Sequence, residues 1–315
     1  MAHRSFQNWT PHDTARWGRE PQRLQHNWHR SALFDLDALA ELIDRYPIEH
    51  YALVATNVSG EPGGGPRRWR EGEIQGLKGH QVIEAIAAGG LWLNLRNVHE
   101  VDRRYAALMD GAYAELQREL PGFAPRDLRM GILISSPGAR VHYHADLPGQ
   151  ALWQVRGRKR LHVYPPTAPY LPPEVLEDIA LTGVEVNMPY RPEFDRDARV
   201  IDLAPGQMAH WPLNAPHRVD NEDCLNVSVT TEHWTEQIRR SQMINVANGV
   251  LRRQLGWQTL NRATEGAGFW AKAALQATWR RSPWARRAQR LQRPIDFRLN
   301  PLQPGRLLDI PAYYR

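Results

Sequence analysis

The chain has 315 residues, of which 42% are hydrophobic and 23% are charged, and its formal net charge is +6. These values predict a globular protein with a full-sized core and exclude a disordered chain. No apolar run approaches membrane-spanning length, the first residues lack a signal-peptide core, and the single Cys224 excludes an intrachain disulfide and a cysteine-based zinc site, so we expect a cytoplasmic protein without a membrane span.

The first third of the chain alternates between predicted helices and strands. Residues 1–32 are polar with scattered tryptophans, and we expect an irregular arm there. A helix begins after Asp35, its N-cap, and ends at Pro47. Hydrophobic spacing and Gly or Pro punctuation then predict, in order, a strand at 50–58, a flexible loop at 61–71, a helix at 80–90, a strand at 91–98 and an amphipathic helix at 101–120.

The middle of the chain, from about residue 128 to residue 234, consists of short β-like runs separated by glycine and proline. Many short strands at such spacing predict a sandwich or a small barrel, so the expected fold class is mainly β with flanking helices (α+β). After Trp234 the spacing becomes helical again. We therefore expect an N-terminal arm (1–32), a β domain with N-terminal helices (33–235) and a basic, Trp-rich helical C-terminal region (236–315).

The stretch "ARVHYHAD" (139–146) carries the first candidate site. Alternate residues of a strand share one face, so His142, His144 and Asp146 are expected on one side, and Val141 and Tyr143 on the other. Two imidazoles and a carboxylate are the set that holds iron in non-haem oxygenases, with one ligand arriving from another segment. A His-x-Asp pair also occurs in strands that bind no metal, so a second segment has to decide between the two interpretations.

That second segment is "GQMAHWPLNAPHRVDN" (206–221), and with it the chain resembles the cupin superfamily. The second cupin motif is matched at Gly206, Pro212, Asn214 in place of a glycine, His217 and Asn221. The first cupin motif is matched at Gly138, His144, Asp146 in place of a histidine, Gln150 in place of a glutamate, and Gly157. The resemblance implies His144, Asp146 and His217 as the metal ligands and leaves His142 and His210 over.

The hairpin that follows extends the resemblance. The stretch "HADLPGQALWQVRGRKRLHVYPP" (144–166) is similar to the core of the JmjC and cupin-like hydroxylases, which have a double-stranded β-helix (jelly-roll) fold. This similarity implies Fe(II) as the metal, 2-oxoglutarate as the cosubstrate, and Lys159 as the cation that holds the distal carboxylate of 2-oxoglutarate. An internal salt bridge is the alternative for a lysine on an apolar strand face.

Other residues in the same segments are candidates for supporting roles. Related asparaginyl hydroxylases place a threonine three residues before the first histidine, where this chain has Val141. Asn226 and Ser228 alternate with apolar residues on the last strand and are candidate cosubstrate contacts, although cross-strand hydrogen bonds would explain them equally well. The residues expected to lie behind the metal ligands are His142, Gln150 and Thr230.

The C-terminal segment holds most of the positive charge. Residues 251–315 contain 13 Lys and Arg and 3 acidic residues, a balance of +10, which leaves −4 for residues 1–250. Such a segment suits nucleic acid, an acidic peptide or an anionic membrane surface, or a solvated face on helices that pack against the barrel or a second subunit.

The leading hypothesis is an Fe(II)/2-oxoglutarate-dependent oxygenase that hydroxylates a protein or peptide side chain. The alternatives are a cupin-fold ligand-binding or regulatory protein without turnover, and an oxygenase acting on nucleic acid. A homodimer is a further expectation, because C-terminal helices often pair subunits in the family that the chain resembles.

Overall fold

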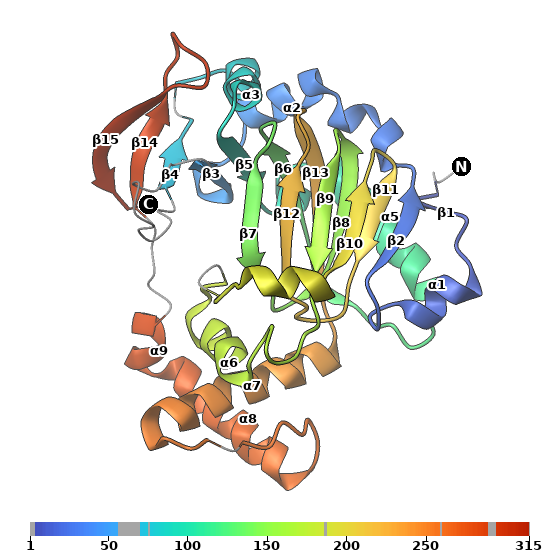
Figure 1. Cartoon of the computed structure of the whole chain (residues 1–315), viewed down its shortest axis with the longest axis vertical. Helices are drawn as coiled ribbons and strands as arrows, with labels where there is room; N and C mark the ends of the chain where they lie inside the picture. Colours follow the sequence, from blue (N-terminus) through green and yellow to red (C-terminus); the bar gives the residue numbers. More distant parts are fainter. Residues whose placement is uncertain are drawn as a thin grey trace.

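The computed structural model describes residues 4–55, 70–74, 76–185, 188–258, 260–288 and 294–314. Two mainly antiparallel sheets face each other, and helices cover the outer face of the larger sheet (Figure 1). The predicted flexible loop at 61–71 falls almost entirely outside the described residues.

The smaller sheet has four strands in the order β10-β9-β12-β7. They are β7 (Arg140–His144), β9 (Lys159–Val163), β10 (Arg199–Leu203) and β12 (His217–Asn221). The order alternates early and late strands, which is the crossing pattern of the double-stranded β-helix that the sequence predicts.

The larger sheet has eleven strands in the order β1-β2-β11-β8-β13-β6-β5-β3-β4-β14-β15. Their bounds are β1 (Phe6–Gln7), β2 (Gln22–His26), β3 (Tyr51–Ala55), β4 (Arg70–Glu73), β5 (Leu91–Leu95), β6 (Arg126–Ser135), β8 (Gly149–Arg156), β11 (Gln207–His210), β13 (Asn226–Trp234), β14 (Ile295–Leu299) and β15 (Leu307–Tyr313).

Nine α-helices lie within the described residues. They are α1 (Pro11–Arg16), α2 (Leu36–Asp44), α3 (Gly79–Ala88), α4 (Val98–Val101), α5 (Arg103–Glu119), α6 (Pro173–Thr182), α7 (Glu236–Leu255), α8 (Gly266–Arg281) and α9 (Pro283–Ala288). The predicted helices after Asp35 and from residue 101 are confirmed as α2 and α5. Asp35 is the N-cap of α2, and Asp102 caps α5 by accepting a hydrogen bond from the Arg104 amide. None of the described helices is long and apolar enough to cross a membrane.

Two apolar clusters hold these layers together. The larger cluster fills the space between the outer face of the large sheet and helices α2, α3 and α5. A smaller cluster, defined by Leu152, Leu161, Val163, Leu203 and Val219, lies between the two sheets. Because this inner cluster occupies only part of the space between the sheets, the remaining inward positions carry the polar groups of the candidate site.

The N-terminal arm contains more regular structure than the sequence predicts. Strand β2 pairs with β11 and so joins the large sheet, and Trp28 stacks on Trp153 of β8 at a ring-centroid distance of 4.0 Å. The tryptophans that suggested an irregular arm are therefore packing residues. The domain boundaries at residues 32 and 235 remain a prediction.

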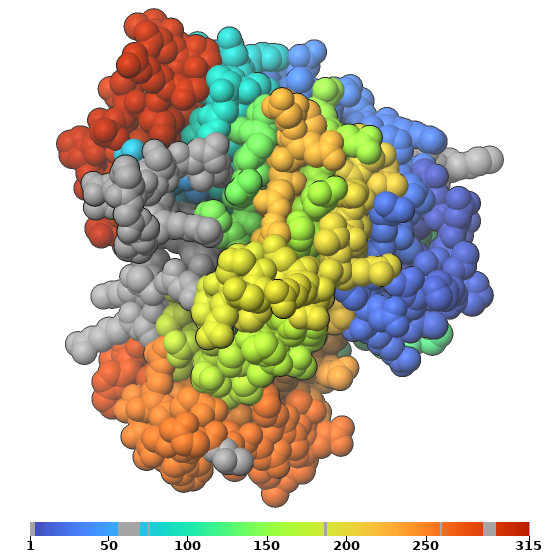
Figure 2. All heavy atoms as spheres, in the orientation of Figure 1, coloured from blue at the N-terminus to red at the C-terminus, as the bar shows by residue number. Residues whose placement is uncertain are grey.

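The C-terminal region divides into two parts. Helix α7 packs against α6 and α8 packs against α7, so that α7, α8 and α9 form a lobe at one end of the molecule (Figure 2). Residues 295–313 then return to the opposite end, where β14 pairs in parallel with β4 and extends the large sheet. The β14–β15 hairpin corrects the expectation that the whole of residues 236–315 is a helical region.

Candidate metal centre

Strands β7 and β12 place the two predicted histidine ligands beside each other. His144 ends β7, His217 begins β12, and the two are directly paired, with their ring centroids 4.1 Å apart. Asp146 follows β7 by two residues and brings its Oδ2 to 3.3 Å from Nε2 of His217. One ligand atom from each of the three residues lies within 4.8 Å of the other two. The structure thus brings the predicted triad together.

Both imidazoles keep one nitrogen free for a ligand. Nδ1 of His144 lies 2.7 Å from the carbonyl oxygen of His142, and Nδ1 of His217 lies 3.0 Å from that of Ala215. Because a carbonyl only accepts, each Nδ1 is the donor and each Nε2 retains its lone pair. Burial, together with the neighbouring His144, lowers the pKa of His217 well below its ordinary value. Both effects favour the neutral imidazole that metal binding requires.

The carboxylate of Asp146 completes a donor set that fits a metal ion. Asp146 is buried, and its Oδ2 has no hydrogen-bond partner among the described residues. Burial raises the pKa of this carboxyl group, because the charged form loses its hydration. A divalent cation would supply the missing charge, and two imidazoles with one carboxylate form the set that suits non-haem Fe(II). The residues present therefore fit the metal that the family resemblance implies.

Asn214, three residues before His217, is hydrogen-bonded to the loop that carries Asp146. Its φ of 59° lies in the left-handed region, which asparagine adopts more readily than most residues. This explains why asparagine can stand where the cupin motif has glycine. The Asn214 amide also donates from Nδ2 to the carbonyl oxygen of Asp146 over 2.6 Å, and so fixes the backbone that carries the carboxylate.

A β-bulge in β7 changes which residues face inward. His217 pairs with His144, but Val219 pairs with Val141, so three residue steps along β7 match two steps along β12. Val141 therefore packs against the inner cluster, whereas Tyr143 packs on the outer side beneath α6. The prediction that Val141 faces away from His144 is wrong, because strict alternation holds only in a strand without a bulge.

Lys159 begins β9 and points into the space between the sheets. Its side chain is 3% exposed, and its Nζ has no hydrogen bond or ion pair with any residue that the structure describes. Burial lowers its pKa to about 7. Lys159 shares a strand face with Val163, which pairs with His217, so about 13 Å of strand rise separates the lysine from the triad. The described residues thus do not include the internal salt-bridge partner weighed as the alternative.

Asn226 and Ser228 lie between the sheets as the sequence predicts, and they bond to a residue that sequence analysis did not single out. Nε2 of Gln154 donates to Oδ1 of Asn226 over 2.7 Å, and the Ser228 hydroxyl donates to Oε1 of Gln154 over 2.6 Å. All three residues are fully buried. The cross-strand hydrogen bonds considered for Asn226 and Ser228 are therefore present, and a contact with 2-oxoglutarate remains a prediction.

The residues expected to lie behind the ligands occupy three different positions. His142 contributes its carbonyl oxygen to orient His144, as described above. The backbone oxygen of Gln150 lies 2.7 Å from Nδ1 of His210, whose ring stacks on Trp17 at 3.7 Å. His210 thus belongs to the helix-covered side of the large sheet. Thr230 lines the cavity described next.

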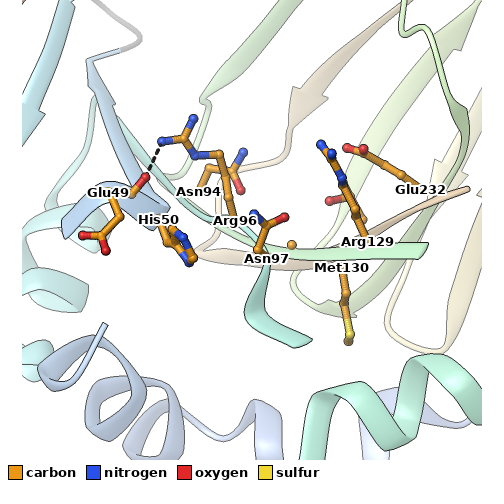
Figure 3. Close-up of a pocket in the computed structure, with 10 residues that line it drawn as sticks. Glu49, His50, Asn94, Arg96, Asn97, Arg129, Met130 and Glu232 are labelled. Carbon is orange, nitrogen blue, oxygen red and sulfur yellow. Dashed lines mark hydrogen bonds between the residues drawn. The ribbon is translucent and has the colours of Figure 1, made fainter. Parts of the chain in front are cut away.

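A polar cavity of about 280 Å³ opens on the large sheet, where β5, β6 and β13 lie side by side (Figure 3). Its lining consists of Glu49, His50, Asn94, Arg96, Asn97, Arg129, Met130, Gly131, Thr230 and Glu232. Figure 3 shows Arg129 and Glu232 directed to one side of the sheet and Met130 to the other. Burial and the nearby charge of Asp146 raise the pKa of Glu232 to about 7. Glu232, which lines the cavity, thus lies near enough to Asp146 for the two carboxyl groups to interact.

Of these lining residues, the sequence pointed to Thr230 alone. The available signal was the alternation of polar residues along 226–232, which continues from Thr230 to Glu232. The other residues come from segments far apart in the chain.

Comparisons with known proteins give a partial sequence match. No family model matches the chain. HSPB1-associated protein 1 of Rattus norvegicus is 31% identical over 141 residues, which cover 42% of this chain and 29% of that protein. The Homo sapiens protein of the same name is 30% identical over 141 residues and is covered to 28%. The chain thus spans under a third of the length of the curated relatives it matches.

A structural match covers nearly the whole chain. An X-ray structure of Escherichia coli YcfD matches 90% of this chain and 71% of its own, with a TM-score of 0.52 and 19% identity. This chain has the fold of YcfD. A second crystal structure of the same Escherichia coli protein, described as the ribosomal oxygenase YcfD, has a TM-score of 0.49. The predicted α+β fold with a cupin-type double-stranded β-helix core is confirmed, and the resemblance that implied it holds for the fold and for the His-x-Asp…His triad.

Proposed function

We propose that the chain is an Fe(II)- and 2-oxoglutarate-dependent oxygenase that hydroxylates a protein or peptide side chain. The observation that carries this proposal is the convergence of His144, Asp146 and His217 within 4.8 Å, with Nε2 of both histidines free and Oδ2 of Asp146 unpaired among the described residues. YcfD is a ribosomal oxygenase, and the extension of oxygenase activity from YcfD to this chain is part of the same proposal.

The residues have separate tasks in this proposal. Nε2 of His144, Nε2 of His217 and Oδ2 of Asp146 would hold Fe(II) from one side, which leaves its other positions open. Fe(II) with 2-oxoglutarate supplies the oxidising chemistry that hydroxylates a carbon–hydrogen bond. Lys159 would hold the distal carboxylate of the cosubstrate, since a buried amine is stabilised by an anion beside it. The inner cluster around Leu161 and Val163 would exclude water from the space between Lys159 and the metal ligands.

Arginines of the C-terminal lobe form ion pairs with α6, and this favours a protein or peptide substrate over nucleic acid. Arg252 and Arg262 both pair with the buried Glu177 of α6, and Arg253 pairs with Asp178. These cations join the lobe to the rest of the protein, so part of the excess positive charge is structural. We also propose a cytoplasmic location, because a reducing compartment suits both ferrous iron and a free cysteine.

The test combines metal content with cosubstrate turnover. The full chain is loaded anaerobically with Fe(II) and assayed for succinate formed from 2-oxoglutarate. We expect about one Fe(II) per chain, and succinate that depends on Fe(II). Asp146→Ala and His217→Ala should each lower metal affinity by more than about 100-fold, since even residues behind a metal ligand change it 10- to 100-fold. His162→Ala is the matched control, because His162 lies on the outer side of the same sheet beside Arg218 and Asp220.

Two results would overturn the proposal. Unchanged succinate formation in the Asp146→Ala, His217→Ala double variant would place the chemistry elsewhere. Tight 2-oxoglutarate binding without oxygen consumption, with Fe(II) bound, would favour the alternative of a cupin-fold binding protein.

A further inference from the structure

The inner face of β13 runs from the Lys159 end of the space between the sheets to the triad. Asn226 and Ser228 form its first part and are satisfied by Gln154. Thr230 and Glu232 form its second part, line the cavity, and have no such contact with Gln154. The inward polar side chains of β13 are therefore hydrogen-bonded to Gln154 at the lysine end. At the metal end, where a substrate would have to approach, they line the cavity instead.

Gly131 makes room for the polar floor of this cavity. It lies on β6 directly opposite Thr230 of β13. A Cβ at Gly131 would stand 3.0 Å from the Thr230 hydroxyl and 3.3 Å from Oδ1 of Asn94. The hydroxyl and the amide oxygen thus converge on the space that the glycine leaves free. A side chain here would fill the very place where a small polar group of a ligand could enter.

Oxygens of two side chains beside this floor lack donors among the described residues. Oδ1 of Asn94 is buried and has no hydrogen-bond partner among the described residues. The Glu232 carboxylate has no hydrogen bond or ion pair within the described part of the chain, and Arg129 attracts it only from a longer distance. Arg96 already donates to the carbonyl oxygens of Glu49 and Tyr51, as Figure 3 shows for Glu49. An occupant that satisfies these oxygens would therefore have to bring donors of its own.

We propose that this cavity is the substrate side-chain subsite of the proposed oxygenase, and that Asn94, Thr230 and Glu232 select a side chain ending in N–H donors. The proposal rests on the proposed function for its link to catalysis. An amine, a guanidinium or a carboxamide shares the required chemistry. A carboxylate does not, because it brings no N–H donor for Oδ1 of Asn94 and its charge would lie near the carboxyl group of Glu232.

The test uses small probes and the full-length protein, so that it does not depend on turnover. Methylammonium, methylguanidinium, acetamide and acetate are titrated separately and followed by ligand-observed NMR. We expect saturable binding of one or more of the three donors, and their rank identifies which kind of side chain the subsite accepts. Acetate should not bind at the same concentrations.

Variants locate the binding. Glu232→Gln and Thr230→Val preserve side-chain size, and each should weaken binding of the preferred probe by about 10-fold or more, as expected for a buried hydrogen bond to a charged group. Gly131→Ala should abolish it by filling the floor. Glu222→Gln is the matched control, because Glu222 is an exposed carboxylate paired with Arg158 at the other end of the barrel, and its variant should bind as the wild type does.

The outcomes separate this inference from the proposed function. Equal binding of acetate, unchanged binding in Glu232→Gln and Thr230→Val, or no probe binding at all would overturn the subsite. Metal content and 2-oxoglutarate binding, measured on the same samples, report on the proposed function. If probes bind and metal does not, the cavity stands as a donor-selective site and the oxygenase assignment falls.

Discussion

The two ends of the space between the sheets satisfy their polar groups in opposite ways. At one end, Gln154 and its neighbours on β13 bond to one another and leave the amine of Lys159 without a partner among the described residues. At the other end, Asp146 and Asn94 present oxygens that lack hydrogen-bond partners in the described part of the chain. A closed network around one cation suits a small anion, whereas clustered free acceptors suit a metal ion and a donor-bearing ligand. Binding capacity therefore lies in the groups that the fold leaves unsatisfied.

The largest effect on this contrast is expected from Lys159→Met. Removing the buried cation should weaken 2-oxoglutarate binding by about 100-fold or more, measured by calorimetry on the metal-loaded protein. The same change should stabilise the ligand-free protein by about 1–4 kcal/mol, because an uncompensated buried amine is replaced by an apolar side chain. Equal 2-oxoglutarate affinity in the variant would show that the anion is held elsewhere.

The stabilisation by Lys159→Met should also depend on pH. The folded-state pKa of Lys159 is lowered to about 7 from 10.5, so the unfolded chain binds the extra proton between these values and wild-type stability rises with pH there. The advantage of the variant in the free energy of unfolding should therefore be largest at pH 7 and below and should vanish near pH 10. Arg158→Met is the matched control, because Arg158 is an exposed cation one residue away and should show no such trend.

A smaller effect is expected from Asn214→Ala at the metal end. Alanine at a φ of 59° is strained, and the hydrogen bond to the Asp146 backbone is lost, so unfolding in urea should show a loss of about 1–3 kcal/mol. Affinity for Co(II) should fall about 10-fold because the carboxylate is less well oriented. Asn214→Gly removes the strain but does not restore the hydrogen bond, so it should recover stability more than metal affinity. If glycine and alanine behave alike, backbone conformation is not what Asn214 contributes.

The smallest effect is expected from Val141→Thr. The bulge turns this position inward, so the new hydroxyl would stand where related asparaginyl hydroxylases have a threonine, and it should tighten 2-oxoglutarate binding by about 2- to 10-fold. Titration of the metal-loaded protein measures this. Were residue 141 to face outward, as simple strand alternation predicts, the affinity would not change.

The metal ligands could be predicted from the sequence because the spacing of the two cupin motifs indicates them directly. His144 and Asp146 are two residues apart, and His217 stands in register within a second motif, so no knowledge of long-range packing was needed. Lys159 followed in the same way from its position after the hairpin. The facing of Val141 was missed, because a bulge depends on how the partner strand pairs and leaves no mark in local alternation.

The cavity was out of reach for a different reason. Asn94, Gly131 and Glu232 lie on three separate strands, and each is ordinary in its own segment. Only the strand order β13-β6-β5 brings them to one floor. The β14–β15 hairpin was missed likewise, because its partner β4 lies more than 200 residues earlier in the chain.

The β14–β15 hairpin also affects how the protein behaves before folding is complete. Phe297 of β14 is fully buried and lies so close over Gly72 that a Cβ there would come within 2.3 Å of its ring. Until residues 295–313 have been synthesised, β4 lacks its neighbour β14 and offers an open strand edge to other chains. A shortened protein that ends after α9 would retain the metal triad and yet be prone to self-association, so its poor behaviour in solution would say nothing about the active site.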